Sequence, residues 1–182
     1  MTRLNPLNAS WLYTESRETP MHVGALMPFK LPAGAPSDYL RQMMAEFKRH
    51  KHFAPPWNRK LATTMLKSPV HRWIEDTDID LEAHLRHTAL PYPGGERELG
   101  ALIARLHSQP LDLTRPPWEF TLIEGLEGHR FAFFIKMHHS LIDGVSGMKL
   151  LQRVMPTDAG KSKDVPPFWA TGPQRKPKRG GQ

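Results

Sequence analysis

Residues 118–139 read WEFTLIEGLEGHRFAFFIKMHH, and this stretch is the most informative part of the sequence. Two runs of aromatic and β-branched residues, 118–124 and 130–137, flank a glycine-containing turn, a pattern typical of a β-hairpin. The second run is apolar on both faces apart from Lys136, as expected for a central strand that is covered on both sides. The sequence therefore predicts a hairpin in the middle of a sheet, with its second strand leading directly into His138.

The segments around the hairpin predict one further strand and three helices. Apolar residues alternate over residues 22–31, which indicates a strand, and Pro28 favours an edge position or a bulge. Apolar residues at helical spacing predict helices over 37–51, 96–108 and 145–155. We expect an α/β domain with a mixed, mostly antiparallel sheet and packed helices.

Other segments carry weaker signals. Residues 63–66 and 70–74 are compatible with short strands of unspecified register. His22 is expected to be a hydrogen-bonded structural histidine. Four tryptophans are expected to be packing anchors at the core or its rim: Trp11, Trp57, Trp73 and Trp118. The last helix is expected to bury one apolar stripe, formed by Val145, Met148, Leu151 and Met155.

Charge and composition exclude several classes of protein. The formal charge is +7, but residues 160–182 carry +5 of it, which argues against a broad nucleic-acid-binding face on the body. We expect one domain over residues 1–156 and a basic Pro/Gly-rich linker over 157–182, with weak attraction to an anionic lipid surface as the alternative role of the tail. The absence of cysteine excludes disulfides, thiolate metal sites and a cysteine nucleophile. With neither a long apolar run nor a secretory signal, the sequence predicts a soluble cytoplasmic protein.

The run from His138 to Gly144 is the candidate for chemistry. A histidine at the end of a buried strand can accept a proton, Asp143 can order the turn, and Gly144 permits an unusual backbone angle or close packing. The run contains neither a nucleophile nor an oxyanion donor, so it suits a base that acts directly on a substrate hydroxyl or thiol. A metal pair is disfavoured because adjacent strand residues point to opposite faces. For the bare pair of histidines, two satisfied core side chains are the alternative.

This run resembles a family signature. His139-Ser140-Leu141-Ile142-Asp143-Gly144 matches the HxxxDG motif of the coenzyme-A-dependent acyltransferases, and His138 extends it to HHxxxDG. Residues 4–11, 20–24 and 115–119 are similar to the bacterial bifunctional wax ester synthases/diacylglycerol acyltransferases. The last segment departs from their usual Pro-Leu-Trp by having Pro117. The resemblance covers about residues 3–156.

The resemblance implies a fold and a reaction. The fold is a two-layer, chloramphenicol-acetyltransferase-like domain. His139 is the general base, and acyl-CoA is a co-substrate whose acyl group passes to a long-chain alcohol or diacylglycerol, giving wax ester or triacylglycerol. His138 supports it, Asp143 orients the loop by pairing with an arginine, and Gly144 lets the loop turn into the next helix. No bound cofactor is implied, and the coenzyme-A-binding residues are not identified.

Members of this superfamily have two similar domains with the active site between them. We therefore expect a C-terminal domain, missing from this chain, to supply much of the coenzyme A site and the oxyanion stabiliser, and this chain alone to be poorly active. Peripheral contact with a membrane or lipid inclusion is a further expectation. Two alternatives are a condensation-type acyltransferase that uses a carrier-protein thioester and a noncatalytic binding domain.

Overall fold

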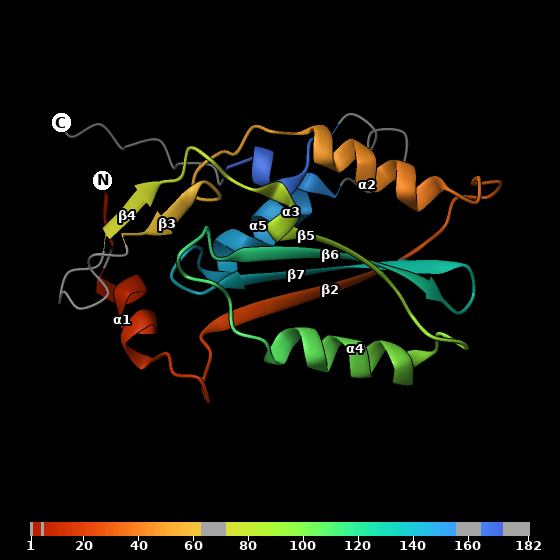
Figure 1. Ribbon diagram of the computed structural model, residues 1–182, viewed down its shortest axis with the longest axis horizontal. Coiled ribbons are helices and arrows are strands. Elements are labelled where there is room, and N and C mark those ends of the chain that lie inside the picture. Colours follow the sequence, from red (N-terminus) through yellow and green to blue (C-terminus); the bar gives the residue numbers. More distant parts are fainter. Residues whose placement is uncertain (1, 5, 63–71, 156–164, 173–182) are drawn as a thin grey trace.

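The computed structural model describes residues 2–4, 6–62, 72–155 and 165–172 (Figure 1). They form a four-stranded sheet in the order β2-β7-β6-β5 and a three-stranded sheet in the order β1-β4-β3. The elements are β1 Thr2–Arg3, α1 Pro6–Thr14, β2 His22–Lys30, α2 Tyr39–Arg49, β3 Arg59–Leu61, β4 Arg72–Glu75, α3 Leu81–His84, β5 Leu85–Ala89, α4 Glu96–Ser108, β6 Trp118–Leu126, β7 Arg130–His138, α5 Gly144–Val154 and the 3-10 helix η3 Phe168–Ala170.

The predicted hairpin forms the centre of the larger sheet. β7 pairs antiparallel with β6 and with β2, while β5 pairs parallel with β6. This confirms a mixed, mostly antiparallel sheet with β7 inside it. β2 is an edge strand, which explains how Pro28 is tolerated, because only one side of the strand needs to donate hydrogen bonds.

Helices cover both faces of this sheet. On one face, Leu99 and Leu102 of α4 pack against Ala132 and Phe134 of β7 and Ile123 of β6. On the other face, α2 and α5 join the main core, which also contains Phe120 of β6 and Phe131 and Ile135 of β7. Figure 1 shows α4 and α2 on opposite sides of the strands. The sheet thus lies between two helical layers, where two layers in total were predicted.

Lys136 is buried in β7 because its ammonium group finds partners at the end of α4. Its Nζ donates to the carbonyl oxygens of Leu106, at 2.8 Å, and Gln109, at 2.7 Å, and lies 3.3 Å from the Glu119 carboxylate. Burial lowers the pKa of Lys136, whereas Glu119 opposes that shift. The charged exception in the apolar strand therefore fastens α4 to the sheet.

The predicted helices are largely confirmed, but α5 buries a different stripe. Val145 and Met148 are 66% and 59% exposed, whereas Gly147 and Leu150 are buried. Leu150 and Leu151 are adjacent, so the sequence offers two neighbouring stripes at helical spacing. The predicted stripe was the one that begins with Val145 and Met148, and these two side chains point away from the core.

The predicted linker from residue 157 is wrong for residues 165–172. Phe168 and Trp169 of η3 are buried in the main core, and the Trp169 ring stacks on Trp118 with ring centroids 5.7 Å apart. The indole N–H of Trp57 donates to the carbonyl of Thr171 at 3.0 Å. Two large aromatic side chains outweigh a Pro-rich composition, because their burial stabilises an ordered position. Residues 156–164 and 173–182 lie outside the described part, as do 63–71 with their compatible strand at 63–66.

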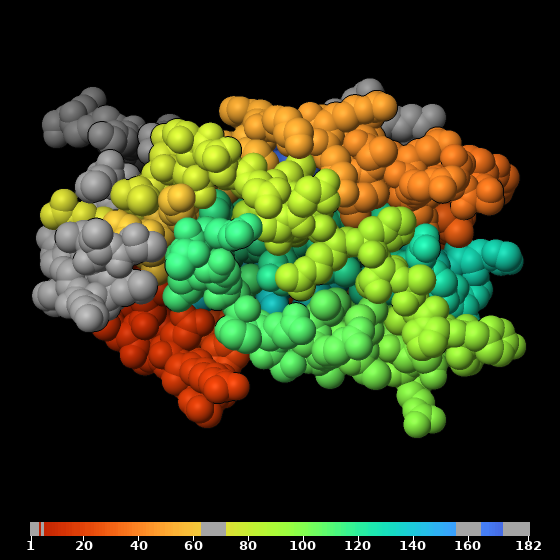
Figure 2. Space-filling model, in the orientation of Figure 1, coloured from red at the N-terminus to blue at the C-terminus, as the bar shows by residue number. Residues whose placement is uncertain are grey.

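Within the described part of the chain, no helix is both long and apolar enough to cross a bilayer. The surface in Figure 2 shows the N-terminal segment that includes α1, in red, projecting at one end of the molecule. α1 has nine residues, none of them charged and none buried. Its place next to the end of β7 bears on the site described below.

Candidate active site

The histidine pair lies where the central strand ends. β7 ends at His138, and His139 follows it. The backbone N–H of His138 donates to the carbonyl of Pro117 at 3.0 Å, and that of His139 donates to the carbonyl of Met21 at 2.9 Å. Pro117 precedes β6 and Met21 precedes β2. The two neighbouring strands therefore hold the backbone of the pair from both sides.

His138 lies on the face of the sheet that α4 covers. It is paired across the strands with His22, whose Nε2 is 2.6 Å from the carbonyl of His107 in the last turn of α4. His22 is thus the hydrogen-bonded structural histidine that the sequence predicts. Burial is the main cause that lowers the pKa of His22, partly offset by the bond to His107.

Both ring nitrogens of His138 are engaged. Nε2 is 2.9 Å from Oε2 of Glu15, and Nδ1 is 2.6 Å from Oγ of Ser140 and accepts from the Ser140 backbone N–H at 3.1 Å. His138 and Ser140 have no exposed surface. A carboxylate accepts only, so Nε2 carries the proton and Nδ1 accepts from Ser140; this tautomer is assigned from the bonding pattern.

The environment keeps His138 neutral. Burial is the largest influence and lowers the pKa of His138, while the Glu15 carboxylate acts against it. With Nε2–H donating and Nδ1 accepting, no lone pair is left for a substrate proton or a metal ion. Both ring nitrogens of His138 are thus held in place, and its supporting role in the reaction stays a prediction.

His139 differs from its neighbour in every respect. It is half-buried, and neither ring nitrogen has a hydrogen bond to another described residue. Its imidazole stacks on the indole of Trp11, with ring centroids 4.5 Å apart and planes inclined by 14°. A stacked ring keeps its edge free, and the lone pair of a neutral imidazole lies at that edge. The arrangement leaves His139 able to accept a proton from a ligand.

A family model described as the wax ester synthase/diacylglycerol acyltransferase catalytic domain matches residues 4–182. The chain belongs to the wax ester synthase/diacylglycerol acyltransferase family. The O-acyltransferase WSD of Acinetobacter baylyi is 38% identical over 185 residues, which are 99% of this chain and 39% of that protein. A Mycobacterium tuberculosis protein with a provisional diacylglycerol O-acyltransferase name is 54% identical over 157 residues, 86% of this chain and 31% of that protein.

Solved structures agree with this membership. The wax ester synthase/diacylglycerol acyltransferase of Marinobacter aquaeolei is 39% identical with a TM-score of 0.86, and the match covers 97% of this chain and 43% of that one. A starter condensation domain solved with C8-CoA has a TM-score of 0.56 at 16% identity, over 84% of this chain and 34% of that one, and so shares the fold alone. The chain spans 31–43% of the length of these wax ester synthase/diacylglycerol acyltransferase relatives.

The family motif ends in an aspartate that caps a helix. Oδ1 of Asp143 accepts from the backbone N–H of Ser146 at 2.8 Å, and Oδ2 accepts from the Ser146 hydroxyl at 2.7 Å. These two bonds are the main cause that lowers the pKa of Asp143. No arginine among the described residues forms an ion pair with Asp143, so the expected partner is replaced here by the start of α5. Asp143 thus connects the motif to the start of α5, and its orienting role stays a prediction.

Gly144 does not have the geometry that the sequence suggested. It is the first residue of α5, its φ lies outside the left-handed region, and a Cβ placed on it would meet no atom within 4 Å. Neither an unusual backbone angle nor close packing among the described residues requires a glycine at this position. The structure gives no physical account of Gly144 within the loop itself.

Two residues that contact the wax ester synthase motif were not found from the sequence. Glu15 binds His138 although 123 positions separate them, and Trp11 was expected only as a packing residue. Residues four apart lie on one side of a helix, so their spacing relates Trp11 to Glu15 but neither of them to the motif. Trp11 lies in α1 and Glu15 directly follows it, so one segment reaches both histidines.

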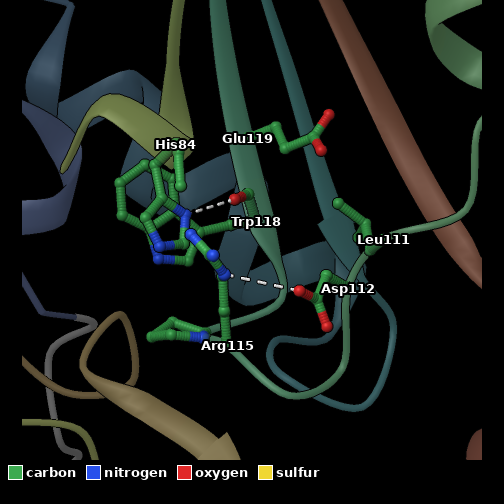
Figure 3. A pocket seen from close by; sticks show the side chains of 8 residues that line it. His84, Leu111, Asp112, Arg115, Trp118 and Glu119 are labelled. Carbon is green, nitrogen blue, oxygen red and sulfur yellow. Dashed lines mark hydrogen bonds and ion pairs between the residues drawn. The ribbon is translucent and has the colours of Figure 1, made fainter. Parts of the chain in front are cut away.

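A separate small cavity lies at the start of β6 (Figure 3). Its volume is about 20 Å³, which accommodates one water molecule and no acyl substrate. Nδ1 of His84 lies 2.8 Å from the carbonyl of Trp118 and the two rings stack, while Arg115 pairs with Asp112 at 3.4 Å. These contacts stabilise the loop before β6, in keeping with the predicted packing role of Trp118.

Proposed function

We propose that this chain carries the proton-accepting part of an acyl-CoA-dependent O-acyltransferase. The acceptors are a long-chain alcohol and diacylglycerol, and the products are wax ester and triacylglycerol. The observation that carries the proposal is the contrast within the histidine pair, in which His138 is fully bonded and His139 keeps its ring edge free. Membership of the family supports the reaction class.

The reaction proceeds without an acyl-enzyme. The acceptor hydroxyl oxygen attacks the thioester carbonyl carbon while a ring nitrogen of His139 takes the hydroxyl proton. The tetrahedral oxyanion then expels the sulfur of coenzyme A, the C–S bond breaks, and the imidazolium returns the proton to that sulfur. The products are one ester and one free thiol, and His139 is again neutral.

Other parts of the site come from outside the described residues. Around His139 the bonded side chains hold the base and its loop, and none of the described contacts forms an oxyanion site. We propose that a further domain, matching the additional length of the relatives, provides the oxyanion donors and the coenzyme A site. Together with His139, these donors and the coenzyme A site would form the complete active site.

The chemistry of α1 supports a proposal of contact with a lipid surface. Its nine residues carry no charge, and Leu7 and Tyr13 are 67% and 57% exposed, so an apolar surface adjoins the base. We propose that this helix meets the lipid in which alcohol and diacylglycerol dissolve. Co-sedimentation with phosphatidylcholine vesicles tests this: Leu7→Asp lowers the bound fraction, and equal binding of variant and wild type contradicts it.

The decisive experiment replaces His139, the proposed base, in the whole protein as expressed from its gene. Release of coenzyme A and formation of ester are followed with palmitoyl-CoA and either hexadecanol or dioleoylglycerol. His139→Ala is expected to lower the ester-forming rate by about 10²–10⁴, the usual contribution of a positioned base. His52→Ala, an exposed histidine, is the matched control and keeps the wild-type rate.

A folded His139→Ala protein with the wild-type rate would exclude His139 as the base. Circular dichroism establishes folding. A parallel assay with a carrier-protein thioester separates the condensation-type reaction, since faster turnover of that donor than of acyl-CoA would replace the proposed substrate. Absence of all thioester turnover by the wild-type protein would favour a noncatalytic binding domain.

A further inference from the structure

Trp11 makes its main contact with the candidate base and not with the core. Ala9 and Leu12, its neighbours in α1, pack against the main core, whereas Trp11 is not among the described residues of either core cluster. Its half-buried indole instead stacks on the imidazole of His139 at 4.5 Å. Among the described residues, the ring contact of this large aromatic side chain is with His139.

The position of α1 over the histidine pair is fixed at two points. Trp11 contacts His139, and Glu15, just after the helix, binds His138 at 2.9 Å. Figure 1 places α1 beside the end of the sheet where β2 begins and β7 finishes. Glu15 therefore holds the segment that carries the indole close to His139.

The stack covers one face of the imidazole of His139 and leaves the ring edge open. The planes are inclined by only 14°, so the indole covers one face of the His139 ring and sets its plane. The ring nitrogens point along the edge, and none of the described residues occupies them. An acceptor hydroxyl can approach in the ring plane, and a ring held at a fixed angle aims its nitrogen lone pair at one position.

The direction of the lone pair matters because a base that deprotonates an alcohol also deprotonates water. Water attacks the same thioester carbonyl, His139 takes a proton, the C–S bond breaks and the sulfur is reprotonated, giving a free fatty acid and coenzyme A. Resting on the function proposed above, we infer that Trp11 is a positioning residue that fixes the ring plane of His139 and so aims its lone pair at the acceptor hydroxyl and not at water. Trp11 thereby sets the ratio of ester to free acid.

The test replaces Trp11 in the protein as the cell makes it and measures both products from labelled palmitoyl-CoA with hexadecanol. Trp11→Leu removes the stacking face and keeps an apolar side chain, and Trp11→Phe restores a ring. Stacked aromatic and cation–π pairs are worth about one tenfold step in rate. We expect Trp11→Leu to lower kcat for ester about tenfold, with KM for acyl-CoA within about twofold, and to raise the acid-to-ester ratio several-fold. Trp11→Phe recovers most of both losses.

Thr14→Ala is the matched control, because within the described part of the chain the Thr14 hydroxyl bonds to the Ser10 and Trp11 carbonyls of its own helix. It keeps the wild-type kcat and product ratio. If Trp11→Leu does not fold, Trp11→Met is judged by the same ratio. An unchanged acid-to-ester ratio, or a raised KM with unchanged kcat, overturns the inference and leaves the proposed function standing. A wild-type protein that forms no ester refutes the proposed function itself.

Discussion

Glu15 offers the sharpest test of how the histidine pair is held. Its carboxylate is 13% exposed and accepts from Nε2 of His138, which has no exposed surface. Glu15→Gln keeps the shape of the side chain and exchanges a charged acceptor for a neutral one. Glu15→Ala removes the acceptor and leaves a buried donor without a partner.

The structure sets the size of each effect. A hydrogen bond to a charged group contributes about 1.5–3 kcal/mol and a neutral one about 0.5–1.5, so Glu15→Gln should cost about 1 kcal/mol. Glu15→Ala should cost about 3 kcal/mol, because the bond is lost and the N–H of His138 stays desolvated. For a domain of this size, each kcal/mol lowers Tm by about 2–4 °C.

Activity should follow the same order. His138 and Ser140 fix the loop that carries His139, and small displacements of a catalytic group cost up to about 10² in rate. We expect the ester-forming rate to fall less than threefold in Glu15→Gln and about 10- to 100-fold in Glu15→Ala. Glu18→Gln, a nearby glutamate that bonds to Ser16, is the control and changes neither quantity.

Differential scanning calorimetry and the ester assay measure these two quantities. Glu15→Ala with the Tm and the ester rate of the wild type would refute the reasoning, because a buried Nε2–H would then have lost its acceptor at no cost. A loss of stability with an unchanged rate would separate the support of the fold from the support of the base.

Two further predictions concern pH and the helix cap. Burial is the main cause that lowers the pKa of His22, His84 and His138 below 6.5, so the unfolded chain takes up protons that the folded one refuses, and stability should fall as the pH drops below about 6.5. Calorimetry between pH 5 and 7.5, roughly spanning that window, should show a shallower slope for His138→Gln, and equal slopes would contradict this. Asp143→Ala should cost about 1 kcal/mol at neutral pH and Asp143→Asn much less, because asparagine also caps helices, as urea unfolding will show. The pKa of Asp143 is lowered, so this contribution is present above pH 3.8 and disappears as the pH falls further; a cap effect that persists in acid would count against it.

Local patterns predicted the centre of the fold well. Helix α4 spans Glu96–Ser108 as expected, and β6 and β7 form the predicted hairpin, because period and turn signals are strong there. Helix α1 was missed because Pro6–Thr14 buries no residue and so shows no apolar stripe. Strand β5, at Leu85–Ala89, is a short edge strand whose parallel pairing with β6 leaves no local mark.

The candidate site was predictable only as far as its motif. The run from His138 to Gly144 could be identified because its residue spacing matches the family motif. The carboxylate of Glu15 and the ring of Trp11 arrive from more than 120 positions away, and no spacing rule within one sequence connects them to the pair. The distinction between His138 and His139 likewise depends on which ring nitrogens find partners.

The burial of Trp169 has a consequence for the order of folding during synthesis. Its indole N–H donates to the carbonyl of His50 at 3.2 Å, and its own carbonyl accepts from the N–H of Ala54 at 2.8 Å. Trp57 and Trp118 are therefore not fully enclosed until residue 169 has left the ribosome, some 30 residues after the histidine pair. Contacts between residues far apart in the sequence form slowly. The aromatic face of the sheet that Trp169 covers therefore stays exposed to solvent during synthesis.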